Sequence, residues 1–92
     1  MPAIEFVLDG DAELREIEAA LAMAETNHQG ELIAELHQRL TDVDGYSAKA
    51  RAAELLSGLG FSQAALQQPV ATFSGGWRVR LNLARALMCR SD

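Results

Sequence analysis

The sequence predicts an all-α fold, a small helical bundle of about five helical segments in a single domain spanning residues 1–92. Alanine, leucine, glutamate and glutamine dominate the composition, whereas proline, threonine and β-branched residues are sparse, and this balance favours helix over strand. Apolar residues recur at helical spacing, and short polar or glycine-containing turns separate the runs. Hydrophobic residues make up 49% of the chain, which is enough for a modest core.

The first half of the sequence predicts a short lead-in segment followed by a helical hairpin over about 11–42. Residues 3–8 form a short helix or an extended segment that closes at 9–10. Asp11 supplies an N-cap for a helix that ends near residue 26, whose apolar face consists of Leu14, Ile17, Leu21 and Ala24. After a turn over 27–30, a second amphipathic helix closes around residue 41 and carries Leu32, Ile33, Leu36 and Leu40.

The second half predicts two longer helices, over about 47–58 and 74–89. The apolar face expected for the first of them consists of Tyr46, Ala50, Ala53 and Leu56, and Gly58 and Gly60 stop it. Ser62 caps a short helix through Leu66, and Pro69 keeps residues 70–72 extended. The last helix carries an apolar stripe of Trp77, Leu81, Ala84 and Met88, widened by Val79, Leu83, Ala86 and Leu87.

The start of that last helix is the most informative stretch, and it reads FSGGWRVRLNLARAL from Phe73. Gly75 and Gly76 leave the free N–H groups of the helix start accessible, and the helix dipole adds positive potential there. Ser74 occupies the N-cap position, so its hydroxyl either caps the helix or faces a ligand oxygen. These features predict a phosphate site, while the structural alternative is a capped helix whose glycines relieve a tight turn.

The stretch resembles the signature motif of ABC-type ATPases, commonly written L-S-G-G-Q with an A-R-A-L ending. Phe73 stands for the leucine, Trp77 for the glutamine, and Arg80 falls on the usual arginine. The tryptophan and the arginines after it are similar to the first cassette of ABC-F proteins, which are soluble twin-cassette ATPases and mostly translation factors on the ribosome. The resemblance continues upstream through residues 46–56 and 58–61, and it is closest to the YheS-like branch.

The resemblance implies that Ser74, Gly75, Gly76 and Trp77 bind nucleotide in trans, at the γ-phosphate of an ATP that the second cassette of the same parent chain holds with Mg. The phosphate-binding Walker A loop and the acidic Walker B strand are both missing, and the only lysine, Lys49, lies between alanines. The chain is therefore expected to be a helical signature subdomain with no catalytic residue of its own, which neither hydrolyses ATP nor binds it tightly.

Two other functions remain open at this point. The chain is alternatively the helical subdomain of a transporter's nucleotide-binding domain, which docks on a transmembrane partner, or a non-ATPase helical interaction module that carries S-G-G by chance. Trp77 likewise has two readings, as a pocket or interface contact and as a core residue.

The charges are divided along the chain. Residues 1–54 hold twelve acidic and four basic residues, whereas residues 55–92 hold four arginines and one aspartate. Arg78 either attracts nucleotide phosphate or ribosomal RNA or lies on a solvated face, and Arg80 and Arg85 are expected to form structural pairs. The resemblance implies that this hairpin is where ABC-F proteins carry an arm that reaches ribosomal RNA or protein, so any arm is reduced here to the turn over 27–30. Its acidic flanks favour a plain surface turn over RNA contact.

Other classes of function find little support in the sequence. A single cysteine, Cys89, fits a reducing compartment. Neither a signal peptide nor a membrane-spanning run is recognisable, so the expected location is the cytoplasm with no membrane partner. His28 and His37 have no further ligands at metal-binding spacing and are expected to face solvent, which predicts no metal site.

Overall fold

The computed structural model describes residues 1–88 and confirms the all-α fold, with no strand among these residues. Its α-helices are α1 (Ala3–Leu8), α2 (Ala12–Thr26), α3 (Gly30–Asp42), α4 (Ala48–Gly58) and α5 (Gly75–Met88). Single 3-10 turns occur at η1 (Gly45–Ser47), η2 (Ala64–Gln67) and η3 (Val70–Thr72). Cys89, where the last helix was expected to end, lies outside the described residues.

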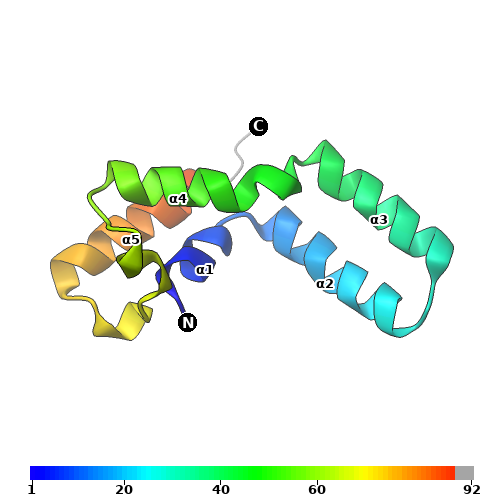
Figure 1. Ribbon diagram of the computed structural model, residues 1–92, viewed down its shortest axis with the longest axis horizontal. Coiled ribbons are helices and arrows are strands. Elements are labelled where there is room, and N and C mark those ends of the chain that lie inside the picture. The colour runs from blue at the N-terminus through cyan, green and yellow to red at the C-terminus, as the bar shows by residue number, and fades with distance from the viewer. Residues whose placement is uncertain (89–92) are drawn as a thin grey trace.

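Helix α1 lies at the centre of the body and packs against both α4 and α5. Its Ile4 and Val7 are buried together with Leu56 of α4 and Leu81 of α5. Helices α2 and α3 form the predicted antiparallel hairpin and project away from this body, as Figure 1 shows. The molecule therefore measures 45 × 28 × 18 Å, and its radius of gyration of 14.7 Å exceeds the value of about 12 Å expected for a compact domain of this length.

The first turn of α5 and the tip of the α2–α3 hairpin lie at opposite ends of the long axis (Figure 1). Two connections join the hairpin to the body. One is the turn η1, which contacts both α3 and α4, and the other is the junction between α1 and α2.

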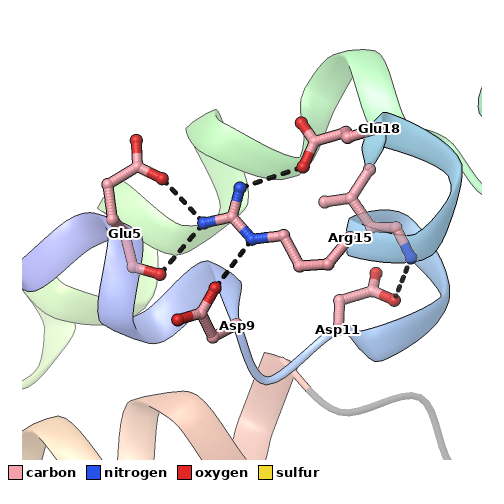
Figure 2. Close-up of polar contacts among 6 residues, drawn as sticks. Glu5, Asp9, Asp11, Arg15 and Glu18 are labelled. Atoms are coloured by element: carbon pink, nitrogen blue, oxygen red, sulfur yellow. Dashed lines mark hydrogen bonds and ion pairs between the residues drawn. The ribbon is translucent and has the colours of Figure 1, made fainter. Parts of the chain in front are cut away.

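That junction is fixed by a helix cap and by one arginine (Figure 2). The buried Asp11 carboxylate accepts a hydrogen bond from the Leu14 N–H at 3.2 Å, as expected for an N-cap. The Arg15 guanidinium meets the carboxylates of Glu5 at 2.6 Å and of Asp9 and Glu18 at 2.9 Å each. Desolvation by burial lowers the pKa of Arg15, but the hydrogen bonds of Glu5 and Glu18 and the nearby negative charges outweigh it and raise the pKa.

The structure corrects the faces predicted for α4 and α5. In α4 the buried residues are Ala48, Ala52 and Leu56, of which only Leu56 belongs to the predicted face. Of the other residues on that face, Ala50 and also Tyr46, which lies in η1, are exposed. In α5 the stripe of Leu81, Ala84 and Met88 is buried as predicted. The residues expected to widen that stripe are exposed; they are Val79, Leu83, Ala86 and Leu87.

The approach to α5 also differs from the prediction. Residues 70–72 form a 3-10 turn instead of an extended segment, because the Thr72 N–H and hydroxyl both donate to the Pro69 carbonyl, at 3.0 and 2.7 Å. The predicted Ser62 cap is present, since its hydroxyl accepts a hydrogen bond from the Ala65 N–H at 3.2 Å. The N-terminus holds this approach in place, with Ala3 N–H donating to Gln68 and Val70 N–H to Met1.

Candidate functional site

The candidate site is the first turn of α5, which begins at Gly75 directly after Ser74. Ser74, Gly75 and Gly76 are all exposed, and the Arg78 N–H donates to the Ser74 carbonyl at 2.9 Å to close the turn. The preceding N–H groups have no acceptor within the helix, so they remain available to an anion. A Cβ atom built on either glycine meets nothing within 4 Å. The two glycines therefore leave the surface beside these N–H groups without side-chain cover.

The Ser74 hydroxyl makes no hydrogen bond to any other described residue, so of the two roles that the sequence left open it does not have the capping one. It lines two neighbouring hollows instead. One, of about 390 Å³, extends from Ser74 toward Phe61, Gln68 and Phe73, and the other, of about 230 Å³, is bounded by Ser74, Gly76, Trp77 and Arg80. Ser74 therefore lies at the surface of both hollows.

Trp77 lines both of these hollows. One side of its ring packs edge-on against Phe61, with the centroids 4.9 Å apart and the planes at 66°. The residue nevertheless remains 37% exposed, so it both packs against the body and borders the site. The sequence left open whether Trp77 lines a pocket or packs as a core residue, and its side chain does both in part.

The arginines of α5 are engaged within the fold. Arg78 donates to the Ala71 carbonyl at 2.8 Å, and Arg80 donates to the Leu59 carbonyl at 3.2 Å. The guanidinium carbon of Arg80 lies 4.5 Å from the Trp77 ring centroid, and that of Arg85 lies 4.8 Å from the Phe6 ring centroid. The structural role predicted for Arg80 and Arg85 is observed, although their partners among the described residues are rings and a carbonyl instead of acids.

A second concave surface, which the sequence did not indicate, lies between α4 and α5. This groove of about 500 Å³ is lined mainly by apolar residues, among them Leu55, Leu59, Leu87 and Met88. Arg51 also lines it, and its Nε and Nη2 atoms are buried with no hydrogen-bond partner in the described part of the chain. No spacing rule would have singled out Arg51, because its burial depends on the packing of α5 across α4.

The remaining polar candidates lie away from this turn. His28 is exposed at the hairpin tip, and the exposed His37 shares a hydrogen bond of 2.9 Å between its Nδ1 and the Tyr46 hydroxyl. Within residues 1–88, no three side chains of the metal-binding types lie close enough together to hold an ion. In the same range, every helix is too short or too polar to cross a lipid bilayer.

The family of the chain follows from its sequence matches. The family model described as ABC transporter matches residues 7–92, which include the whole of α5 and the turn before it. The chain belongs to the ABC transporter family. The S-G-G turn of this family member is therefore part of a recognised family sequence and is not a chance occurrence on an unrelated helical module.

The relatives of this ABC family member confirm the ABC-F resemblance. It is 54% identical to the probable ATP-binding protein YheS of Escherichia coli over 98% of the chain, and 43% identical to the human ATP-binding cassette sub-family F member 3 over 99%. The protein GCN20 of Saccharomyces cerevisiae is 55% identical over 63% of the chain. The chain spans 14%, 14% and 8% of these relatives, respectively. No solved structure matches it.

Proposed function

We propose that this chain is the helical signature subdomain of the first cassette of an ABC-F ATPase. In this role Ser74, Gly75 and Gly76 contact the γ-phosphate of an ATP held, with its Mg ion, by the second cassette of the same parent protein. The observation that carries the proposal is the exposed start of α5, where N–H groups without an acceptor in the helix lie beside two glycines and an unpaired serine hydroxyl. The names of the relatives, which include an ATP-binding protein, support the same substrate.

The subdomain contributes binding and positioning, and the parent protein performs the hydrolysis. Backbone N–H groups that are already oriented stabilise negative charge on phosphate without reorganising, and this is commonly worth about 10²-fold or more in rate. Arg78 adds positive potential near the turn, although its own hydrogen bond with Ala71 holds it back from direct contact.

The ABC-F resemblance extends the proposal to the parent protein. We infer that the parent is a cytoplasmic translation factor that associates with ribosomal RNA or protein. Residues 27–30 at the hairpin tip would be the part of this chain nearest to such a partner, because the hairpin projects furthest from the body (Figure 1). The acidic flanks of that turn favour contact with protein over contact with the RNA backbone.

The test is Gly76→Asp in the parent ATPase, assayed without ribosomes, with Gly30→Asp as the matched control. Both changes place a carboxylate in the first turn of a helix, where a Cβ atom meets nothing within 4 Å. An acid near a helix start stabilises by about 0.3–1 kcal/mol, so neither variant should unfold. Gly76→Asp is expected to reduce ATP turnover about 10²-fold or more, because the carboxylate repels the γ-phosphate. Near-normal turnover in a folded Gly76→Asp protein would rule out the assignment.

A further inference from the structure

Trp77 is the first residue of α5 with a side chain, because the helix begins with two glycines. Gly75 and Gly76 make no side-chain contacts that could hold the start of the helix, and the Ser74 hydroxyl has no partner among the described residues. Glycine also has the greatest backbone freedom of any residue. The direction of the free N–H groups therefore depends on whatever fixes the backbone just after them.

The Trp77 ring is held from two sides. The buried Phe61 meets it edge to face at 4.9 Å, a favoured geometry for aromatic pairs. Arg80, three residues further along the helix, lays its guanidinium 4.5 Å from the ring centroid, within the range of a cation–π contact. Both contacts restrict the rotation of the indole.

Each of these two neighbours is itself anchored outside α5. Phe61 also packs edge-on against Phe73, with the centroids 5.6 Å apart, and Arg80 donates to the Leu59 carbonyl at 3.2 Å. The turn after α4 and the residue before Ser74 are thereby joined to the Trp77 ring. Phe61 thus links Phe73 to the ring, and Arg80 links the Leu59 carbonyl to it.

Gly60 lies beside this arrangement. Its φ of +99° is a conformation that residues with side chains rarely adopt, so the backbone of this turn favours glycine. A Cβ atom there would lie 3.3 Å from Arg80 Nη1, which is tight, and 3.6 Å from Trp77 Cη2, which is an ordinary van der Waals contact. The ring and the guanidinium therefore both lie close to the backbone of Gly60.

We propose that Trp77 is a positioning residue, whose ring, held between Phe61 and Arg80, orients the N–H groups of Gly75 and Gly76 toward the γ-phosphate. The inference rests on the proposed function and deepens it. Arg80 acts through the ring instead of on the nucleotide, because its guanidinium is already engaged with Trp77 and with the Leu59 carbonyl. Trp77 and Arg80 are therefore expected to depend on each other in any measurement of the site.

The first experiment uses the 92-residue chain, in which Trp77 is the only tryptophan. Arg80→Gln and Phe61→Leu are each expected to shift the Trp77 fluorescence maximum and to increase its quenching by acrylamide, because the ring loses one of the contacts that restrain it. Val79→Ala is the matched control, since Val79 lies in the same turn and is 68% exposed. If the Trp77 emission is unchanged in Arg80→Gln, then Arg80 does not restrain the ring, and the proposal is overturned.

The second experiment measures ATP turnover in the parent protein. Trp77→Ala is expected to lower kcat by about 10- to 100-fold, the cost of a small misplacement of catalytic groups, and to leave KM nearly unchanged. Trp77→Phe should recover most of the rate, because a phenyl ring still meets Phe61 and Arg80. If Trp77→Ala fails to fold, Arg80→Gln carries the test with the same expected loss of kcat.

The outcomes separate this inference from the proposed function. Normal kcat in a folded Trp77→Ala or Arg80→Gln protein, together with inactive Gly76→Asp, would overturn the positioning role and leave the signature assignment intact. Normal turnover in Gly76→Asp would remove the proposed function itself. A loss in Trp77→Ala that Trp77→Phe does not recover would also contradict the inference, because the ring contacts would then not be what matters.

Discussion

Replacing Arg15 with methionine is expected to lower the free energy of unfolding by about 1–2 kcal/mol at low salt. Arg15 contacts three carboxylates at 2.6–2.9 Å and donates a further hydrogen bond to the Glu5 carbonyl at 3.0 Å. The acidic side chains are 31–45% exposed, so water screens each pair and limits it to about 0.2–1 kcal/mol. Methionine keeps most of the apolar stem, which leaves the loss of charge as the main change.

The assay is urea denaturation followed by helical circular dichroism, at low salt and at about 1 M salt, where the Debye length falls to about 3 Å. The difference between the parent chain and Arg15→Met should shrink markedly at high salt. Arg39→Met is the matched control, because Arg39 is exposed on α3 and forms no ion pair with the described residues. Equal losses in the two variants, or a loss in Arg15→Met that salt does not change, would refute the electrostatic account of the α1–α2 junction.

Two further substitutions probe how α5 packs on the rest of the body. Gly10→Ala should destabilise the chain by about 1–3 kcal/mol in the same denaturation assay, because its Cβ atom would collide with the Arg85 carbonyl, whereas Gly30→Ala, in open space, should not. Arg51→Met should raise the free energy of unfolding by about 1 kcal/mol, since it removes two buried, unpartnered nitrogen atoms, and the exposed Lys49→Met should have little effect. If Gly10→Ala were as stable as the unchanged protein, the close approach of Gly10 to the Arg85 carbonyl would be refuted. If Arg51→Met were less stable than the unchanged protein, the account of the buried Arg51 nitrogen atoms would be refuted.

The order of the helices could be predicted because the sequence marks where each one starts or stops. Asp11 caps α2, Gly58 lies at the end of α4, and Gly75 opens α5. The turn over 70–72 was missed because Pro69 is compatible with both an extended segment and a turn. The hydrogen bond from the Thr72 hydroxyl to the Pro69 carbonyl selects the turn.

The faces of the helices were harder to predict than their positions. In α4, alanines occur on both candidate faces, so the spacing alone did not distinguish the buried Ala48 and Ala52 from the exposed Ala50. In α5, the apolar residues Val79, Leu83 and Leu87 are exposed within the described chain. Whether an apolar residue of this helix is buried depends on where the neighbouring helices lie, which the sequence of α5 does not show. Periodicity reports where apolar side chains lie on a helix and not what packs against them.

The candidate site also contains some features that the sequence shows and others that only the tertiary fold creates. Ser74, Gly75 and Gly76 were recognisable because their chemistry is local to one turn. The contact between Trp77 and Arg80 also had a signal in the sequence, since residues three apart on a helix are neighbours. The contact between Trp77 and Phe61 had none, because it joins segments that only the tertiary fold brings together.

An exposed helix start with its nearby arginines engaged elsewhere is poorly suited to bind a nucleotide alone. Such a terminus contributes about 0.3–1 kcal/mol toward an exposed anion, whereas micromolar affinity requires about 8 kcal/mol. Arg78 and Arg80, the nearest cations of the described chain, are held by the carbonyls of Ala71 and Leu59. Under the proposed function, most of the affinity for ATP would therefore come from the opposing cassette. The signature turn would add its small contribution only when the two cassettes close, so closure would depend on the nucleotide that the opposing cassette already holds.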